Sequence, residues 1–202
     1  MRIETFPAGP LETNAYLVID PVSSEAIVVD APPDVSTLLL PAIKELGSKV
    51  RRIIITHGHW DHIAGLRELA DALDVPVAVH PLVVERLTRP APDLPVPVEP
   101  VEPWERLDEG DELSVGALRF RVMHLPGHDP GHIVLYAPSE GIVLGGDVLF
   151  PGGHGRTDIP GSDQATMDRS LARLAALPDA VTVYPGHGRP TTIGAERGWM
   201  PR

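Results

Sequence analysis

The stretch "THGHWDHIAG", residues 56–65, places four side chains that can bind metal within six positions: His57, His59, Asp61 and His62. Imidazole and carboxylate groups crowded in one turn cost free energy, because they lose hydration on burial and repel one another when they carry like charge. A bound cation offsets this cost. The stretch therefore predicts a metal site, because packing of a protein core gives no reason for such a cluster of side chains.

The segments around this stretch predict alternating strands and helices. "RRIIIT" (51–56) is a short apolar run typical of a buried strand, and residues 61–73 carry apolar side chains at helical spacing. Further elements are expected on either side: a hairpin of 15–20 and 25–30, a helix over about 34–46, a strand over 75–80 and a short helix over 81–88. Pro41 predicts that the helix over 34–46 is kinked or starts after that residue.

The second half of the chain repeats this pattern. Antiparallel strands are expected over 112–115, 117–125, 132–138 and 141–150, a helix over 162–178 that is capped by Ser162 or Asp163, and a final strand over 180–184. Between the halves, residues 89–103 are too rich in proline to form a helix. We expect this segment to cross the surface of one domain that spans residues 1–202.

Composition limits the functions that the chain can have. Its 17 basic and 28 acidic residues give a net charge of −11, which disfavours nucleic acid as a partner. No apolar run approaches the roughly 20 residues that a membrane helix needs, and no secretory signal is visible. We therefore expect a cytoplasmic protein with no membrane partner. The chain contains no cysteine, which excludes disulfides, thiolate metal ligands and a cysteine nucleophile.

Three further motifs place metal-capable residues where predicted strands end. "LPGHDPGH" (125–132) contributes His128, "GGDVLF" (145–150) contributes Asp147, and "YPGHG" (184–188) contributes His187. With the first motif this gives seven candidate ligands, whereas one zinc ion takes about four. The count therefore predicts two metal ions. His57 and His59 point to the same side of an extended segment and can share one ion, whereas Asp61 and His62 can reach the other.

The order of these motifs resembles the metallo-β-lactamase superfamily. "GGDVLFPGGHGRTDIPGSDQATMDRSL" and "YPGHGRPTTIGAER" are similar to small, single-domain relatives of hydroxyacylglutathione hydrolase, the glyoxalase II-like proteins. The resemblance covers nearly the whole chain. It implies an α/β fold with four layers, an αββα sandwich, and a metal site at one edge of the two sheets.

The resemblance also implies a ligand set and a reaction. In the family pattern, His57, His59 and His128 hold one metal, Asp61, His62 and His187 hold the second, and Asp147 bridges them. A bridging hydroxide then attacks the carbonyl of a small thioester, such as a hydroxyacylglutathione, or of a related ester, and Asp61 orients it. Zinc is the expected metal, and iron and manganese suit the same ligands.

Residues that contact the substrate are harder to predict. The candidates are one aromatic residue, one histidine and three arginines: Trp60, His154, Arg156, Arg189 and Arg197. The basic C-terminal helices of full-length glyoxalase II have no counterpart before Arg202, so we expect glutathione thioesters to bind weakly. His132 is a candidate support for the ligands, whereas His80 and His124 are expected to be structural.

Two other activities remain open from the sequence. The first is a persulfide dioxygenase of the same fold that holds one iron. Those relatives replace the final "PGHG" with "PAHDY", and this chain keeps "YPGHG" and the Asp61–His62 pair, which favours hydrolysis. The second is hydrolysis of lactones or other esters. A metal-bound protein without catalysis is disfavoured, because structural zinc sites are normally closed cages of four ligands.

Overall fold

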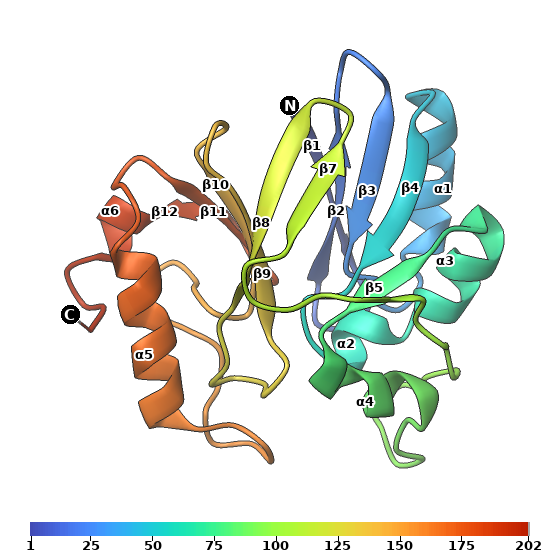
Figure 1. Cartoon of the computed structure of the whole chain (residues 1–202). Helices are drawn as coiled ribbons and strands as arrows, with labels where there is room; N and C mark the ends of the chain where they lie inside the picture. Colours follow the sequence, from blue (N-terminus) through green and yellow to red (C-terminus); the bar gives the residue numbers. More distant parts are fainter. Residues whose placement is uncertain (202) are drawn as a thin grey trace.

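The computed structural model describes residues 1–201 and consists of two six-stranded sheets packed face to face between outer helices (Figure 1). The four-layer α/β sandwich expected from the sequence is confirmed. No helix within the described residues is long and apolar enough to cross a membrane.

The first sheet contains the N-terminal strands in sequence order. They are β1 (Arg2–Ala8), β2 (Thr13–Ile19), β3 (Glu25–Val29), β4 (Lys49–Ile54), β5 (Val77–Val79) and β6 (Glu105–Arg106). β1, β2 and β3 are antiparallel, whereas β3 to β6 run parallel to one another. The carboxyl ends of β3, β4 and β5 therefore lie at the same edge of the sheet.

The second sheet has the order β12-β11-β10-β9-β8-β7. Its strands are β7 (Glu112–Val115), β8 (Leu118–His124), β9 (Ile133–Ala137), β10 (Ile142–Gly146), β11 (Thr182–Pro185) and β12 (Thr191–Thr192). β10 and β11 are parallel, and the other neighbours are antiparallel. The loops that follow β8, β10 and β11 meet at the edge that also receives the end of β4.

Alternation of side chains along the strands builds three apolar cores. On β2, Leu17 packs toward the outer helices and Val18 packs toward the other sheet, because successive side chains of a strand point to opposite faces. The helices α1 (Ser36–Glu45), α3 (Leu66–Leu73) and α4 (Val84–Thr88) cover the first sheet, and α5 (Gln164–Ala175) covers the second.

Several details differ from the sequence expectations. The helix expected over 61–73 is split into α2 (Trp60–Ile63) and α3, because the Gly65 N–H donates to the Ala31 carbonyl oxygen at 2.9 Å and not to a carbonyl of its own helix. A Cβ atom at Gly65 would clash with the Pro32 carbonyl oxygen. The helix expected over 81–88 begins as a 3-10 turn, η1 (Pro81–Val83). β1, β6, β12 and the short helix α6 (Ile193–Glu196) were not predicted. α1 begins before Pro41 and contains it, so the alternative that this helix starts after Pro41 is wrong. The predicted cap of α5 is confirmed, because Asp163 accepts a hydrogen bond from the Thr166 N–H group.

Candidate metal centre

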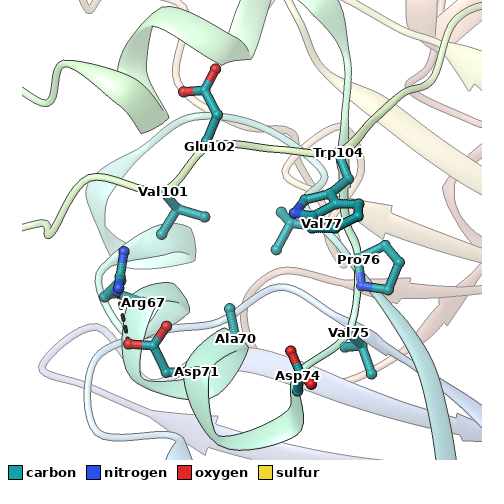
Figure 2. A pocket seen from close by; sticks show the side chains of 10 residues that line it. All are labelled: Arg67, Ala70, Asp71, Asp74, Val75, Pro76, Val77, Val101, Glu102 and Trp104. Carbon is teal, nitrogen blue, oxygen red and sulfur yellow. Dashed lines mark hydrogen bonds and ion pairs between the residues drawn. The ribbon is translucent and has the colours of Figure 1, made fainter.

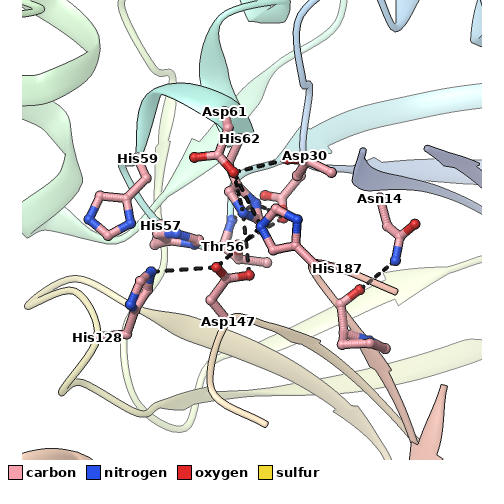
Figure 3. A network of polar contacts seen from close by, with 12 residues as sticks. Asn14, Asp30, Thr56, His57, His59, Asp61, His62, His128, Asp147 and His187 are labelled. Atoms are coloured by element: carbon pink, nitrogen blue, oxygen red, sulfur yellow. Dashed lines mark hydrogen bonds and ion pairs between the residues drawn. The ribbon is translucent and has the colours of Figure 1, made fainter. Parts of the chain in front are cut away.

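The seven candidate ligands come from four loops that meet at one edge of the sandwich (Figure 3). The loop after β4 and the short helix α2 contribute four of them, and the loops after β8, β10 and β11 contribute one each: His57, His59, Asp61, His62, His128, Asp147 and His187. The structure thus brings together every residue that the motifs identified.

The donor atoms form two groups that share a carboxylate. The imidazoles of His57, His59 and His128 have nitrogen atoms within 4.8 Å of one another, and Asp61, His62 and His187 form an equally close group. Asp147 lies between the groups (Figure 3). Its Oδ2 is 3.5 Å from His128 Nε2 and 3.4 Å from His187 Nε2, and its Oδ1 is 3.4 Å from His62 Nε2. The arrangement matches two neighbouring cation positions joined by one carboxylate.

Hydrogen bonds on the outer side of the cluster fix two of the histidines. Asp30 Oδ2 lies 2.8 Å from His62 Nδ1 and accepts the Thr56 hydroxyl at 2.9 Å, and its Oδ1 accepts the Thr56 N–H. The Thr56 hydroxyl in turn lies 3.0 Å from His57 Nδ1. In the neutral form of both rings, these bonds place the proton on Nδ1 and leave Nε2 with the lone pair that faces the centre. Asp30 thus orients ligands of both groups.

Backbone carbonyl groups orient two further histidines in the same way. His128 Nδ1 is 2.8 Å from the Arg156 carbonyl oxygen, and His187 Nδ1 is 3.1 Å from that of Leu11. Nε2 of each ring therefore faces Asp147. Such outer bonds are the usual support of metal-binding histidines, because they select the tautomer and hold the ring.

Several buried atoms of the cluster lack a hydrogen-bond partner within the described residues. They are Nε2 of His57, His62 and His128, and Oδ1 of Asp147. Buried polar atoms in native proteins are nearly always paired, so four orphaned atoms aimed at one place are a strong anomaly. Divalent cations that accept imidazole and carboxylate ligands satisfy all four. The residues present therefore fit a pair of such ions.

The electrostatic environment prepares the ligands in two ways. Burial and, second to it, neighbouring imidazoles lower the pKa of His57 far below its usual value and that of His59 to about 3, so these rings stay neutral. Burial opposes ionisation of Asp61, yet the His187 hydrogen bond and the charge of His62 outweigh it and lower its pKa to about 2. Neutral imidazoles and ionised carboxylates are the forms that bind metal.

The other group holds protons that compete with a cation. Burial alone would lower the pKa of His62, but the negative charges of Asp30 and Asp147 raise it well above its usual value. Burial also opposes protonation of His187, but hydrogen bonds to Asp147 and Asp61 outweigh it and raise the pKa of His187 to about 9. Binding of a metal at this group must therefore release protons near neutral pH.

Residues that the motifs did not identify support the cluster. The Thr13 hydroxyl donates to Asp61 Oδ2 at 2.9 Å. The Asn14 amide donates to the carbonyl oxygens of Pro185 and Gly188, which holds the loop of His187 in place (Figure 3). Short polar residues such as Thr13 and Asn14 at the start of a strand have no sequence pattern that predicts a supporting role. Their contacts with the loop of His187 form only when the two sheets pack together.

His132 behaves as the sequence suggested. Its Nε2 accepts the backbone N–H of Asp147 at 2.9 Å, and its ring stacks on that of His57. Gly146 precedes Asp147 with a positive φ of 46°, and a Cβ atom there would meet the His132 ring. Glycine therefore allows the strand end to turn so closely that the carboxylate of Asp147 enters the cluster.

A second histidine pair forms no convincing metal site. His80, Asp108 and His124 also place donor atoms within 4.8 Å of one another. However, His80 Nδ1 accepts the Leu82 N–H at 3.2 Å, so its proton lies on Nε2, the atom that faces Asp108. The His124 ring stacks on His80 and donates from Nε2 to the Pro130 carbonyl oxygen. Both histidines are structural, as expected.

A cavity of about 880 Å³ opens beside the cluster. Of the predicted substrate residues, Trp60, His154 and Arg156 line it. Arg197 lies elsewhere and pairs with Asp179 at 2.6 Å, and Arg189 lines a separate small hollow. Two arginines of the α4 region that the sequence analysis missed also line the cavity: Arg86 and Arg89. No motif indicated that this short helix lies beside the site.

Another cavity, of about 530 Å³, lies between α3, the start of β5 and residues 101–104 (Figure 2). Its wall carries the exposed indole of Trp104 and an ion pair between Arg67 and Asp71, 2.8 Å long. Within residues 1–201, no group of three potential metal ligands lies in this cavity. The chemistry therefore gathers in the cavity beside the histidine cluster.

Comparisons with known proteins agree with this geometry. The model of the family described as the metallo-beta-lactamase superfamily matches residues 8–187. The chain is 33% identical over 205 residues to the hydroxyacylglutathione hydrolase GloC of Haemophilus influenzae, a match that covers 98% of this chain and 95% of that protein.

Two solved structures are similar over nearly their whole length. The crystal structure of the B3 metallo-beta-lactamase BLEG-1 superposes with a TM-score of 0.91 at 32% identity and covers 99% of this chain and 98% of that one. The structure of TTHA1623 in a di-iron-bound form has a TM-score of 0.85 at 37% identity and covers 98% of both chains.

Proposed function

We propose that this chain, which belongs to the metallo-beta-lactamase superfamily, is a metal-dependent hydrolase that uses two divalent cations to cleave small thioesters. The observation that carries the proposal is the set of orphaned buried atoms, Nε2 of His57, His62 and His128 and Oδ1 of Asp147, which face one another across the ends of both sheets. The identity to a hydroxyacylglutathione hydrolase supports the choice of substrate class.

The proposed ligand sets follow the two groups of donor atoms. His57, His59 and His128 would hold one cation, and the second would be held by three further residues, with Asp147 shared: Asp61, His62 and His187. When bound, two such cations lower the pKa of water and stabilise negative charge on a carbonyl oxygen. We propose zinc as the metal, and the di-iron form of a similar protein supports iron as the competing choice.

The chain's own residues complete the proposed site. Asp61 is ionised and fixed by the Thr13 hydroxyl, so it can accept a hydrogen bond from the attacking water and orient it. The cavity wall is apolar where Trp60, Phe150 and Ile159 line it. Such a wall accommodates the carbon chain of an acyl group and excludes bulk water from the reacting carbonyl.

Metal analysis followed by parallel assays tests the proposal. The purified protein should contain close to two zinc or iron ions per chain, and removal of both by a chelator should abolish hydrolysis of a hydroxyacylglutathione. Assays of a β-lactam, a lactone and a persulfide with oxygen uptake are run on the same sample. One iron per chain with oxygen uptake and no thioester cleavage would establish a dioxygenase instead.

A further inference from the structure

Arg86 lies beside the proposed centre and is held by a buried carboxylate. Asp129 is 1% exposed, and its Oδ1 accepts the Gly131 N–H at 2.7 Å. Its Oδ2 contacts Arg86 Nη1 and lies 3.9 Å from His59 Nε2. One carboxylate oxygen therefore faces both a proposed metal ligand and a guanidinium group.

The guanidinium group of Arg86 also forms part of the cavity wall. Its side chain is 34% exposed, and its Nη2 lies close to Gly161, which follows the cavity-lining residues Ile159 and Pro160. A guanidinium has five N–H donors in a rigid fork, and within the described residues its ion pair is with Asp129 alone. Donors of Arg86 thus remain available to a ligand in the cavity.

The other cations of the cavity are less suited to binding an anion. Arg156 is 71% exposed, and its Nε and Nη2 donate to the two carboxylate oxygens of Asp158, at 2.8 and 3.1 Å. Arg89 is 77% exposed and pairs with Glu85 one helical turn away. Exposed side chains are flexible and screened by solvent, whereas Arg86 is partly desolvated and fixed by its partner.

We infer that Arg86, anchored by Asp129, binds a carboxylate group of the substrate and makes the enzyme prefer thioesters that carry one. The inference rests on the proposed function and names the substrate class more closely. A fixed guanidinium fork matches the two oxygens of a carboxylate, and a partly dry wall strengthens that interaction. The carboxylate can belong to the thiol half or to the acyl half of the thioester.

Three substrates distinguish these sources. S-acetylglutathione carries carboxylates on the thiol half, the succinyl thioester of N-acetylcysteamine carries one on the acyl half, and the acetyl thioester of N-acetylcysteamine carries none. We expect kcat/KM for one of the two charged substrates to exceed that of the neutral substrate by about tenfold or more, mainly through a lower KM. The charged substrate that is preferred identifies the half that contacts Arg86.

The variants must not leave Asp129 as an unpaired buried charge. Arg86→Lys keeps a positive charge near Asp129 but removes the fork, and the double variant Arg86→Met with Asp129→Asn removes both charges together. We expect both to reduce the preference for the charged substrate to about twofold or less. The control is the same pair of substitutions at an exposed ion pair in the cavity of Figure 2, Arg67→Met with Asp71→Asn, which should leave the preference intact.

A binding measurement without metal separates substrate recognition from catalysis. Calorimetry on the chelator-treated full chain should show tighter binding of S-methylglutathione than of its diethyl ester if the thiol half is recognised, or of succinate monoamide than of succinamide if the acyl half is. The double variant should lose this difference. Thermal unfolding of each variant confirms that the chain is folded.

The outcomes separate the two proposals. If none of the thioesters is cleaved by the metal-loaded protein, the proposed function fails, whatever the binding data show. If all three are cleaved with equal kcat/KM, or if Arg156→Met abolishes the preference and the Arg86 variants do not, the inference about Arg86 is wrong and the proposed function stands.

Discussion

The two ends of the sandwich both carry buried or half-buried carboxylates, yet they use them differently. At the end away from the cluster, Asp20 accepts hydrogen bonds from the Val22 N–H, the Ser23 hydroxyl and the Ala117 N–H, at 2.8 to 3.1 Å. Every one of these contacts joins the turn after β2 to itself or to the β7–β8 turn. At the other end, Asp147 Oδ1 and three imidazole nitrogens face one another without a partner among the described residues.

A structural polar cluster and a ligand site can be told apart by whether their buried polar atoms have partners. Both ends are rich in polar residues, and composition alone does not separate them. The end that contains Asp20 satisfies its own hydrogen bonds and needs nothing further. The end that contains Asp147 leaves lone pairs unsatisfied and so requires an external partner. Variants at the two ends should therefore fail in different ways.

Asp147→Ala should have the largest effect. It removes the shared carboxylate, so two cations held by the remaining histidines would repel across a short gap. We expect loss of at least one metal ion per chain and a fall in kcat of more than about 100-fold, since loss of outer support alone can reach that size. His57→Ala should be milder. Measuring metal content and kcat for both variants shows whether Asp147→Ala has the larger effect. Full retention of two ions by Asp147→Ala contradicts the prediction.

Asp30→Asn should have the next largest effect, although Asp30 would touch no metal. The variant removes the charge that orients His62 and, through Thr56, His57. We expect metal affinity to fall about 10- to 100-fold. Competition with a chromophoric chelator measures the affinity. Unchanged affinity at both metal positions would show that the outer hydrogen bonds do not hold the cluster.

Asp20→Asn should lower stability but leave metal affinity unchanged. Hydrogen bonds from Ala117, Val22 and Ser23 lower the pKa of Asp20 in the folded chain. Their stabilising effect is therefore complete above the unfolded pKa of about 3.9 and is lost as the pH falls through the lower folded value. Urea unfolding at pH 7 should show a less stable variant, and the gap to the wild type should narrow below about pH 4. A gap that widens on acidification would refute this account.

Arg189→Ala should have the smallest effect. Arg189 was a candidate for substrate binding, but it lines a hollow that the histidine cluster does not share. We expect KM for every thioester to change less than about twofold, within the scatter of surface substitutions. Steady-state kinetics on all three substrates of the Arg86 experiment decide the matter. A several-fold rise in KM would extend the functional surface beyond the cavity.

The candidate metal ligands could be found from the sequence because each lies in a short motif at the end of a strand. Binding sites of α/β proteins form where strand ends meet at one edge, so the motifs alone predict that His57 and Asp147 lie together. The alternation of predicted strands and helices was compatible with two packed sheets, and the family resemblance implied the four-layer arrangement. The motifs also supplied the resemblance, which assigned the ligands to two groups.

The supporting residues could not be found in this way. Asp30 lies at the end of β3 in "VVDAPP", where an aspartate also suits a simple turn. Asp129 and Arg86 are 43 positions apart in the chain, and only packing of α4 against the loop after β8 brings them together. Contacts of this kind depend on the relative position of elements, which hydrophobic periodicity does not specify.

The loop of His187 contacts the start of β2, so residues from the two ends of the chain must meet before the cluster is complete. Thr13 and His187 form an isolated antiparallel β-bridge, and the Asn14 N–H donates to the Gly186 carbonyl oxygen at 2.7 Å. Synthesis proceeds from the N-terminus at about 5 to 20 residues per second, so this last ligand leaves the ribosome several seconds after His57. A nascent chain can assemble the group of His57, His59 and His128 first, and the second group is complete only near the end of translation. Metal content of ribosome-bound chains of increasing length should rise in two steps in that order.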